Sequence, residues 1–385
     1  MTDRSIYLID PEKHSFWWNT NGPKKLAMFD FDNTLVQQKS SRKFPSSADD
    51  WKPLFGENVI KNKLEQLDKE GYIIVIVSNQ GGVQKKKVSL DDMKDRFKNF
   101  MEYVCVPVYV MASIKYDHCR KPCTGIFDFI MKDVNYGGWC KDEIDVKNSF
   151  YVGDAAGRVK GWDKNDDKRS DFSCSDRKFA YNCGLQFYTP EQYFLEKDPT
   201  DKWEWGGIES ENVIINRGGL TNPELKPRDK PEMIILVGCA ASGKSSLCKL
   251  FPTYLRVNMD TLNSKGKCLK QAKLAAENGI SLIIDNTNPD PETRKAYTDI
   301  AKKYNYYVRA INVVCPKQIA YHLNQMRMEM SSGTREAVPM IAYNIYFKKY
   351  VKPSTTEEDI DEVIDYEWIP KFEDDCQEKM FKKRY

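Results

Sequence analysis

The sequence lacks several features that would assign it to a specialised class of protein. It has no run of 18 or more apolar residues, and its N-terminal stretch MTDRSIYLID lacks the apolar core of a secretion signal. Its 11 cysteines follow no regular spacing, and no second Cys or His pair stands at zinc-ligand spacing from Cys119 and Cys123. The net charge of +3 is too small to indicate a nucleic-acid partner by itself. We therefore expect an intracellular globular protein with reduced thiols and no membrane partner.

Apolar runs separated by helix-like stretches are the main pattern that is present. Each run ends in small or polar residues, which is typical of parallel strands in an α/β protein with helices on both faces of the sheet. The ligand site of such a sheet lies beyond the carboxyl ends of its strands. The runs are 26–31, 73–77, 149–152, 233–238, 280–284 and 307–314.

A stretch rich in proline, glycine and charge separates the first three runs from the last three. It covers 216–230 and has the composition of a linker. A chain of 385 residues is long enough for two domains. We predict two parallel-sheet α/β domains, one over 1–215 and one over 231–385.

The segment LAMFDFDNTLV at 26–36 carries Asp30, Asp32 and Thr34 at the end of a buried run. Alternation along a strand directs Asp30 and Asp32 to the same side. Two buried carboxylates repel each other unless a positive charge compensates them, so we predict Mg²⁺ between them. One carboxylate could then attack phosphorus to form an aspartyl-phosphate, and the other could protonate the leaving oxygen and activate water.

A phosphatase of this kind needs three more groups, and the chain offers them in order. Ser78 follows IIVIV and could hold phosphate, Lys121 in CRKPCTG could neutralise charge, and Asp154 in FYVGDAAGR could bind the metal. Each residue alone has a structural alternative, namely a strand-end cap, a surface lysine and a turn. Together they favour a phosphatase over glycoside hydrolysis, which would leave Lys121 unexplained.

The segment GCAASGKS at 238–245 matches the phosphate-binding pattern G-x-x-x-x-G-K-S between a strand and a helix. Backbone N–H groups of such a loop face bound phosphates, Lys244 would bridge the terminal phosphates, and Ser245 would help to hold Mg²⁺. We therefore expect the second domain to bind a nucleoside triphosphate. The predicted contact residues are Gly238, Ser242, Gly243, Lys244, Ser245 and Ser246.

Three further residues of the second half have two interpretations each. Asp260 in VNMDTL could accept the proton of an attacking hydroxyl, or cap the next helix. Asp285 in LIIDNTN could support the metal or orient catalytic groups, or cap the helix after Pro289. Arg327 could close over the phosphates as a lid arginine, or lie on the surface of its helix.

The D-x-D-x-T motif with Ser78, Lys121 and Gly-Asp resembles the haloacid dehalogenase phosphatase superfamily. The resemblance narrows with GDAAGR, the block at 171–194, the phosphate-binding loop, VNMDTL and DNTNP. Together these segments resemble the polynucleotide kinase 3′-phosphatase family, with the phosphatase first. The resemblance implies a haloacid dehalogenase-like domain followed by a P-loop kinase domain, acting on DNA strand ends in break repair in the nucleus as a monomer.

The resemblance also implies residue roles. It makes Asp30 the nucleophile that removes a 3′-phosphate, Asp32 the general acid/base and Asp154 a Mg²⁺ ligand supported by Asp171. In the second domain it implies phosphorylation of a 5′-hydroxyl by ATP. Lys244 and Ser245 would bind ATP, Asp260 would activate the hydroxyl, and Arg327 would clamp phosphate.

The sequence departs from the family pattern at Met259 and Gln325, where arginines are common. It also has only a short segment before the first domain, so we expect no forkhead-associated domain for recruitment to phosphoproteins.

Several alternatives remain open at the level of sequence. They are an RNA-end healing enzyme, a silent scaffold that binds nucleic-acid ends, and a small-metabolite phosphatase fused to a kinase. Aromatic residues beside charges could stack on bases or pack internally. These aromatic residues are Trp139, Trp162 and the tryptophans of 202–207.

Overall fold

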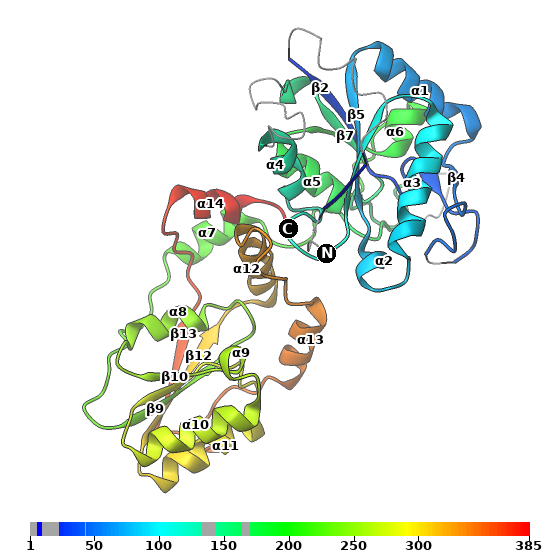
Figure 1. The fold of residues 1–385 in the computed structure, drawn as a ribbon. Helices are drawn as coiled ribbons and strands as arrows, with labels where there is room; N and C mark the ends of the chain where they lie inside the picture. The colour runs from blue at the N-terminus through cyan, green and yellow to red at the C-terminus, as the bar shows by residue number, and fades with distance from the viewer. Residues whose placement is uncertain (1–5, 10–22, 43, 133–143, 164–169) are drawn as a thin grey trace. The chain divides into compact units, whose positions relative to one another are not determined.

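The computed structural model describes residues 6–9, 23–42, 44–132, 144–163 and 170–385, so Trp139 lies outside the described part. The chain divides into two compact units (Figure 1). Unit 1 comprises Met1–Gly207, Arg327–Ala337 and Lys383–Tyr385, and unit 2 comprises Ile208–Met326 and Val338–Lys382. Each unit is built around its own mainly parallel sheet, which confirms the predicted α/β class.

The sheet of unit 1 has six strands in the order β1-β6-β5-β2-β7-β8. All neighbouring strands are parallel except β1, which is antiparallel to β6. The strands are β1 (Ile6–Ile9), β2 (Lys25–Phe29), β5 (Tyr72–Asn79), β6 (Val108–Ser113), β7 (Phe150–Val152) and β8 (Gln186–Tyr188). A short separate hairpin pairs β3 (Val36–Gln37) with β4 (Lys52–Pro53). Because β2 lies between β5 and β7, the ends of these three strands meet at one edge of the sheet.

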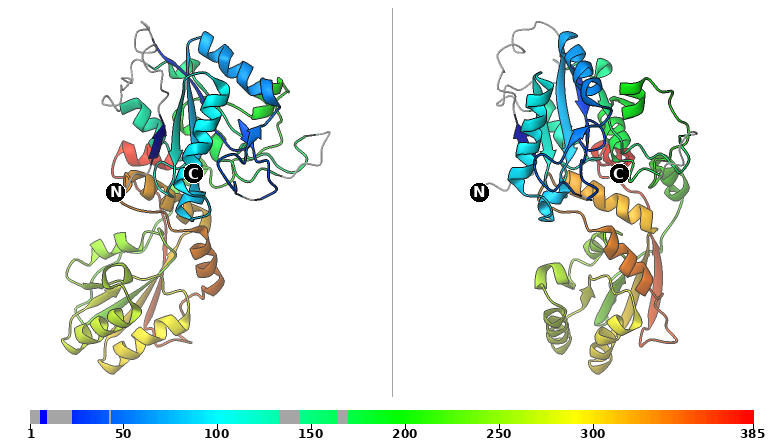
Figure 2. Two further views of the ribbon diagram at one scale, coloured as in Figure 1. Left: turned by 45° about the vertical axis from the view of Figure 1, so that its right-hand side comes forward. Right: turned by 90° about the vertical axis from the view of Figure 1, so that its right-hand side faces the viewer.

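Helices cover both faces of this sheet (Figures 1 and 2). Alternate residues of β2 enter different cores: Ala27 and Phe29 pack with the helices of one face, and Leu26 and Met28 with those of the other. The first face carries α1 (Glu57–Lys69), α3 (Leu90–Val104) and α6 (Pro190–Leu195), and the second carries α4 (Gly125–Lys132) and α5 (Ser175–Cys183). Short turns of helix occur at α2 (Gly81–Gln84) and η3 (Val146–Asn148).

The sheet of unit 2 has five parallel strands in the order β10-β11-β9-β12-β13. They are β9 (Glu232–Val237), β10 (Leu255–Val257), β11 (Leu282–Ile284), β12 (Tyr307–Val314) and β13 (Glu362–Glu367). The helices α10 (Lys265–Glu277) and α11 (Pro291–Lys303) pack on one face, while α8 (Lys244–Leu247) and η4 (Cys248–Leu250) pack on the other. The remaining helices are α7 (Ser210–Gly218), α9 (Met259–Leu262), α12 (Lys317–Met330), α13 (Met340–Lys349) and α14 (Asp375–Lys382).

No helix among the described residues has the length and apolar character needed to span a membrane.

The unit boundaries differ from the predicted domains 1–215 and 231–385. Helix α7 belongs to unit 2 and extends into the predicted linker 216–230, where Leu225 is buried in the second core of unit 2. The segments Arg327–Ala337 and Lys383–Tyr385 belong to unit 1 although they follow most of unit 2. Contacts within unit 1 explain this assignment.

Glu329 is the centre of those contacts. Its buried carboxylate accepts hydrogen bonds from the backbone N–H of Thr124 (2.9 Å) and from the Tyr385 hydroxyl (2.5 Å), and it forms an ion pair with Lys383 (2.8 Å). No periodicity of the sequence links these distant residues.

Candidate active sites

A buried lysine organises the strand ends of unit 1. The Lys121 Nζ atom lies 2.8 Å from Asp30 Oδ1 and 2.8 Å from Asp176 Oδ1. It also donates to the backbone carbonyl of Val77 (2.8 Å) and to the Tyr151 hydroxyl (2.6 Å). Burial works against the charge of Lys121, yet Asp176 and Asp30 together hold the pKa of its ammonium above the ordinary value. Lys121 is therefore charged and fixed beside the carboxylate of Asp30.

Three carboxylates surround this lysine. Oxygen atoms of Asp30, Asp154 and Asp176 all lie within 4.8 Å of one another. Burial raises the pKa of Asp30 to about 7 against the opposing effect of Lys121, and burial together with the Asp30 charge raises the pKa of Asp154 well above its usual value. The single positive charge of Lys121 therefore does not compensate the negative charge of three carboxylates. Carboxylate oxygens are the ligands that Mg²⁺ prefers, so this donor set fits the predicted metal.

The loop after β7 positions Asp154 and Asp176. The backbone N–H of Asp154 donates to Thr34 Oγ1 (3.1 Å), and the N–H of Ala155 donates to Asp176 Oδ2 (3.0 Å). A Cβ atom at Gly153 would lie only 2.5 Å from the Asp176 carboxylate, so glycine is needed for this close approach. The threonine of D-x-D-x-T thus ties the β2 loop to the β7 loop.

Asp32 points into a separate polar network. Arg96 of α3 lies 2.7 Å from its Oδ1 atom, and Gln80 Nε2 donates to its Oδ2 atom (2.9 Å). Gln80 also donates to the buried Ser78 hydroxyl (2.9 Å). Asp32 is outside the three-carboxylate group, although the sequence predicted Mg²⁺ between it and Asp30. Neither Arg96 nor Gln80 was expected, because no motif in the sequence marks them.

Asp171 is not one of the three clustered carboxylates, and it holds the loop that follows Asp154. Its carboxylate accepts hydrogen bonds from the backbone N–H groups of Ala156 (3.1 Å) and Arg158 (3.0 Å) and pairs with the Arg158 guanidinium (2.9 Å). Asp176 joins the acidic group instead. The sequence analysis did not predict Asp176. This residue follows a loop and not an apolar run, so it is not recognisable as a residue at the end of a strand.

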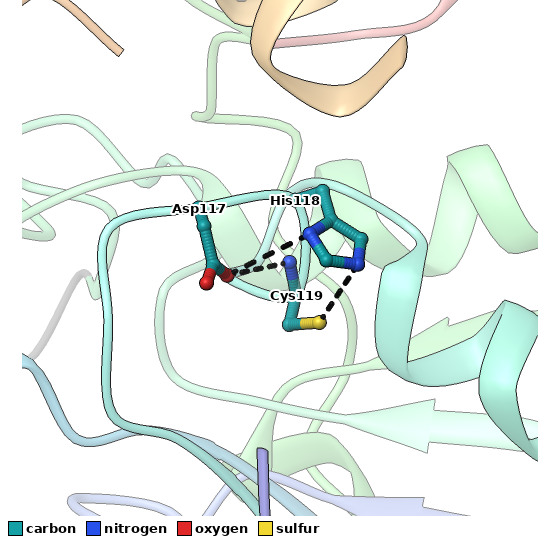
Figure 3. A group of neighbouring side chains, drawn as sticks. All are labelled: Asp117, His118 and Cys119. Carbon is teal, nitrogen blue, oxygen red and sulfur yellow. Dashed lines mark hydrogen bonds and ion pairs between the residues drawn. The ribbon is translucent and has the colours of Figure 1, made fainter. Parts of the chain in front are cut away.

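The turn before Lys121 contains a second set of metal-binding residue types, Asp117, His118 and Cys119 (Figure 3). Asp117 lies 4.0 Å from His118 Nδ1, while Cys119 Sγ lies 3.3 Å from Nε2, on the other side of the ring. The backbone N–H of Cys119 also donates to Asp117 Oδ1 (3.0 Å). Burial raises the pKa of the Cys119 thiol to about 12, which disfavours the thiolate that a metal needs. We assign these contacts to the stability of the turn.

The phosphate-binding loop of unit 2 follows β9. Ala241 and Gly243 have positive φ values of 57° and 98°, a conformation typical of loops whose successive backbone N–H groups bind anions. A Cβ atom at Gly238 would lie 2.7 Å from Ser242 Oγ, so this glycine permits the tight loop. The Ser242 hydroxyl is buried and has no hydrogen-bond partner among the described residues. A loop of this conformation with an unused donor fits the phosphates of ATP. Ser246 lies in α8, and its N–H donates to Gly243.

The two residues after Gly243 make different contacts. Lys244 donates to the backbone carbonyl of Cys239 in the loop. Ser245 donates to Asp285 Oδ2 (2.9 Å), and Asp285 also pairs with Arg256 (2.5 Å). Asp285 therefore orients Ser245 and does not cap a helix, because Asp290 caps α11 through the N–H of Thr293 (2.7 Å).

Asp260 lies exposed in the first turn of α9. The cap of this helix is Asn258, whose side chain accepts from the N–H of Thr261 (2.8 Å). The capping interpretation of Asp260 is therefore excluded, and its carboxylate is accessible. Arg327 lies exposed on α12 and is grouped with unit 1, whereas the phosphate-binding loop belongs to unit 2. The role of Arg327 as a lid arginine stays a prediction.

Comparison with known proteins connects both sites to one family. Residues 25–194 match the family model described as polynucleotide kinase 3 phosphatase, and residues 265–346 match one described as AAA domain. A bifunctional polynucleotide phosphatase/kinase of Schizosaccharomyces pombe is 33% identical over 337 residues, covering 87% of this chain and 78% of the relative. A protein of Acanthamoeba polyphaga mimivirus named for the same two activities is 36% identical over 370 residues, covering 89% and 84%.

A third relative matches only part of the chain. The polynucleotide 3′-phosphatase of Saccharomyces cerevisiae is 28% identical over 214 residues, which cover 43% of this chain and 85% of the relative. The first two relatives match this chain over most of their own length. The chain therefore belongs to the family of bifunctional polynucleotide phosphatase/kinases, and it is an enzyme with a phosphatase domain and a kinase domain.

Proposed function

We propose that the chain processes DNA strand ends in break repair, removing a 3′-phosphate in unit 1 and phosphorylating a 5′-hydroxyl with ATP in unit 2. The observation that carries this proposal is the Asp30 carboxylate 2.8 Å from the Lys121 ammonium, in a group of three carboxylates. The names of the relatives support polynucleotide ends as substrates. The phosphate-binding loop of unit 2 supports the use of ATP.

In the proposed phosphatase reaction, Asp30, Asp32 and Lys121 act on the same phosphate. An Asp30 oxygen attacks phosphorus and the bond from phosphorus to the 3′-oxygen breaks, while Asp32 gives the leaving oxygen a proton. Water then attacks the aspartyl-phosphate and passes its proton to Asp32, which releases phosphate and regenerates Asp30. Lys121 balances charge on the phosphoryl oxygens, and Ser78 can donate a hydrogen bond to them. Arg96 and Gln80 fix the orientation of Asp32.

Asp30 and Asp154 would hold Mg²⁺ in unit 1, where the ion supplies positive charge to the phosphate. Asp176 contributes to the negative charge of the group but is already bonded to Lys121 and Ala155. Its role is to position the lysine.

The kinase reaction uses residues of unit 2. The loop N–H groups and Lys244 bind the β- and γ-phosphates, and Ser245, oriented by Asp285, would hold Mg²⁺. Asp260 accepts the proton of the 5′-hydroxyl as its oxygen attacks the γ-phosphate and ADP leaves. The exposed position of Asp260 suits a substrate as large as a polynucleotide end.

The decisive experiment incubates the full chain with Mg²⁺, ATP and matched DNA and RNA oligonucleotides that carry a 5′-hydroxyl and a 3′-phosphate. We expect both ends of the DNA to be processed. Faster processing of the RNA would assign the enzyme to RNA-end healing instead. Turnover of nucleotides or sugar phosphates without turnover of either oligonucleotide would refute the proposal.

A further inference from the structure

Phe172 is fully exposed. Its exposed fraction is 100%, whereas no other large apolar side chain in the described part of the chain exceeds the 75% of Ile215. Burying a phenylalanine side chain is worth about 1.5–3 kcal/mol, so a fully hydrated ring forgoes that contribution. Neither of the proposed reactions uses this residue.

The backbone that presents Phe172 is firmly held. The N–H of Asp171 donates to the Arg158 carbonyl (2.8 Å), and the N–H of Gly157 donates to the Ser173 carbonyl (3.1 Å). The Asp171 carboxylate adds its bonds to Ala156 and Arg158. These contacts hold the main chain on both sides of Phe172.

This loop is part of the phosphatase site. Its bonding partners are residues 156–158, which begin two residues after Asp154, and the Arg158 guanidinium donates to the Asp154 carbonyl (3.1 Å). Asp176, four residues after Phe172, belongs to the acidic group itself. The exposed ring is thus carried by the same short segments that carry two of the three clustered carboxylates.

A cation and a second aromatic residue also contact residues 156–158. Arg177 donates to the Ala156 carbonyl (2.8 Å), and its guanidinium lies 3.9 Å from the ring centre of Trp203. The N–H of Glu204 donates to the Gly157 carbonyl (2.9 Å), which holds the tryptophan segment in place. Within the residues that the structure describes, no carboxylate forms an ion pair with Arg177. Burial and the charge of Arg158 lower the pKa of Arg177, while Cys174 and Asp171 oppose this shift.

We propose that Phe172 stacks on a base near the 3′-phosphate of a bound strand, and that Arg177, supported by Trp203, contacts a phosphate of its backbone. This inference rests on the proposed 3′-phosphatase function and specifies how the same site recognises a polynucleotide. A nucleic-acid strand offers both a planar base and regularly spaced phosphates, whereas a sugar phosphate offers no base. Stacking of a base on an aromatic side chain contributes about 1–3 kcal/mol and tolerates any base.

The first test compares two substrates, a 3′-phosphorylated DNA oligonucleotide and p-nitrophenyl phosphate, which has a phosphate but no strand. For Phe172→Ala we expect kcat/KM on the oligonucleotide to fall by about 5- to 150-fold more than on p-nitrophenyl phosphate, mainly through KM. Phe172→Trp should restore the ratio, and Phe172→Leu should not. The control is Phe347→Ala, because Phe347 is an exposed aromatic residue of unit 2.

The second test measures binding without turnover. Oligonucleotides that carry 2-aminopurine at successive positions from the 3′-phosphate are added to the Asp30→Asn variant. We expect stacking to quench the fluorescence at one position near the end, and Phe172→Ala in the same background to abolish the quenching.

The outcomes separate this inference from the proposed function. If the wild-type enzyme hydrolyses the oligonucleotide and Phe172→Ala leaves the substrate ratio unchanged, the stacking contact is refuted and the function stands. Restoration by Phe172→Leu as complete as by Phe172→Trp would also refute stacking, since leucine has no aromatic face. If wild-type enzyme hydrolyses only p-nitrophenyl phosphate, both proposals fail.

Discussion

The two sites handle phosphate with opposite electrostatics. The phosphatase site concentrates the carboxylates of Asp30, Asp154 and Asp176 around one lysine, so it needs a further cation before it can accept an anion. The phosphate-binding loop of unit 2 presents backbone N–H groups and Lys244, so it attracts an anion directly. Both sites follow the central strand of a parallel sheet, which shows that strand topology fixes the location of a site but not its charge.

The two sites also fix their lysines differently. Lys121 is buried and is held by two carboxylates, a hydroxyl and a carbonyl. Lys244 donates a hydrogen bond to the backbone carbonyl of Cys239 in its own loop. Lys121 thus has anionic partners from other segments of unit 1, whereas Lys244 contacts the backbone of the loop that is expected to bind phosphate. Five substitutions or conditions test this contrast.

The largest effect is expected for Asp30→Asn. The amide cannot act as the nucleophile, so 3′-phosphatase activity should fall by a factor of about a thousand or more, while 5′-kinase activity stays within about twofold of wild type. Separate assays of the two oligonucleotide ends measure this. A parallel loss of kinase activity in the folded variant would contradict two independent sites.

Lys244→Ala should produce the opposite pattern. Loss of the ammonium removes charge from the terminal phosphates, so we expect kinase activity to fall by about a hundredfold or more and phosphatase activity to remain. Binding of ATP, measured by calorimetry, should weaken in the same variant. Unchanged kinase activity would show that another cation performs this role.

Asp176→Ala should destabilise unit 1 by about 3–5 kcal/mol, because it removes one partner of a buried ion pair with Lys121. Amide hydrogen exchange, measured over a series of urea concentrations, gives the free energy of unfolding of each unit separately. We expect protection in unit 2 to stay as in the wild type. A destabilisation below about 1 kcal/mol would mean that Asp30 alone suffices to hold the lysine.

The raised pKa of Asp30 predicts a pH dependence in the presence of chelator. Its pKa is about 7 in the folded chain against 3.8 ordinarily, so the folded state binds more protons between these values. The stabilisation is therefore present below about pH 4 and is lost as pH rises through 7, by a few kcal/mol at most. Mg²⁺ should reduce the loss because it stabilises the ionised carboxylates.

The control for this pH dependence is Asp30→Asn, whose side chain does not titrate. Free energies of unfolding of unit 1 at pH 5 and pH 8 should differ less in this variant than in the wild type. Equal pH dependence in the two proteins would assign the titration to other groups.

Asp285→Ala is the counterpart of Asp176→Ala in unit 2, and it should destabilise its unit less than Asp176→Ala does. Its ionic partner Arg256 has a side chain that is 45% exposed and can be rehydrated, so we expect a cost of about 1 kcal/mol or less. Kinase activity should nevertheless fall by about tenfold, because Ser245 loses its acceptor. A loss of stability as large as for Asp176→Ala would remove the contrast between the sites.

The sequence predicted those parts of the fold and the phosphatase site that depend on strand ends. Asp30, Ser78 and Asp154 each follow an apolar run, and parallel strands bring such positions to one edge. Asp176 follows a loop, and Arg96 lies in the middle of α3, so no local pattern marks either residue. Their positions depend on packing between distant segments, which the chain order does not reveal.

Two other expectations also depended on packing between distant segments. Asp171 and Asp176 stand in one short block, and only the folded loop decides which of them faces the other carboxylates. The unit boundary at Arg327 falls within a continuous helix, where neither composition nor periodicity changes. Local patterns therefore located strands and motifs, but long-range ion pairs and hydrogen bonds completed the site.

The assignment of Arg327–Ala337 and Lys383–Tyr385 to unit 1 has a consequence for biosynthesis. Domains generally fold as units while the ribosome delivers the chain from its N-terminus. Residues up to Gly207 emerge early, but Thr124, in the turn that carries Lys121, receives its Glu329 partner only after most of unit 2 has been made. Lys383 and Tyr385 join that partner later still. The unit that starts first is thus finished last, and a chain whose translation stops inside the kinase domain cannot complete its phosphatase.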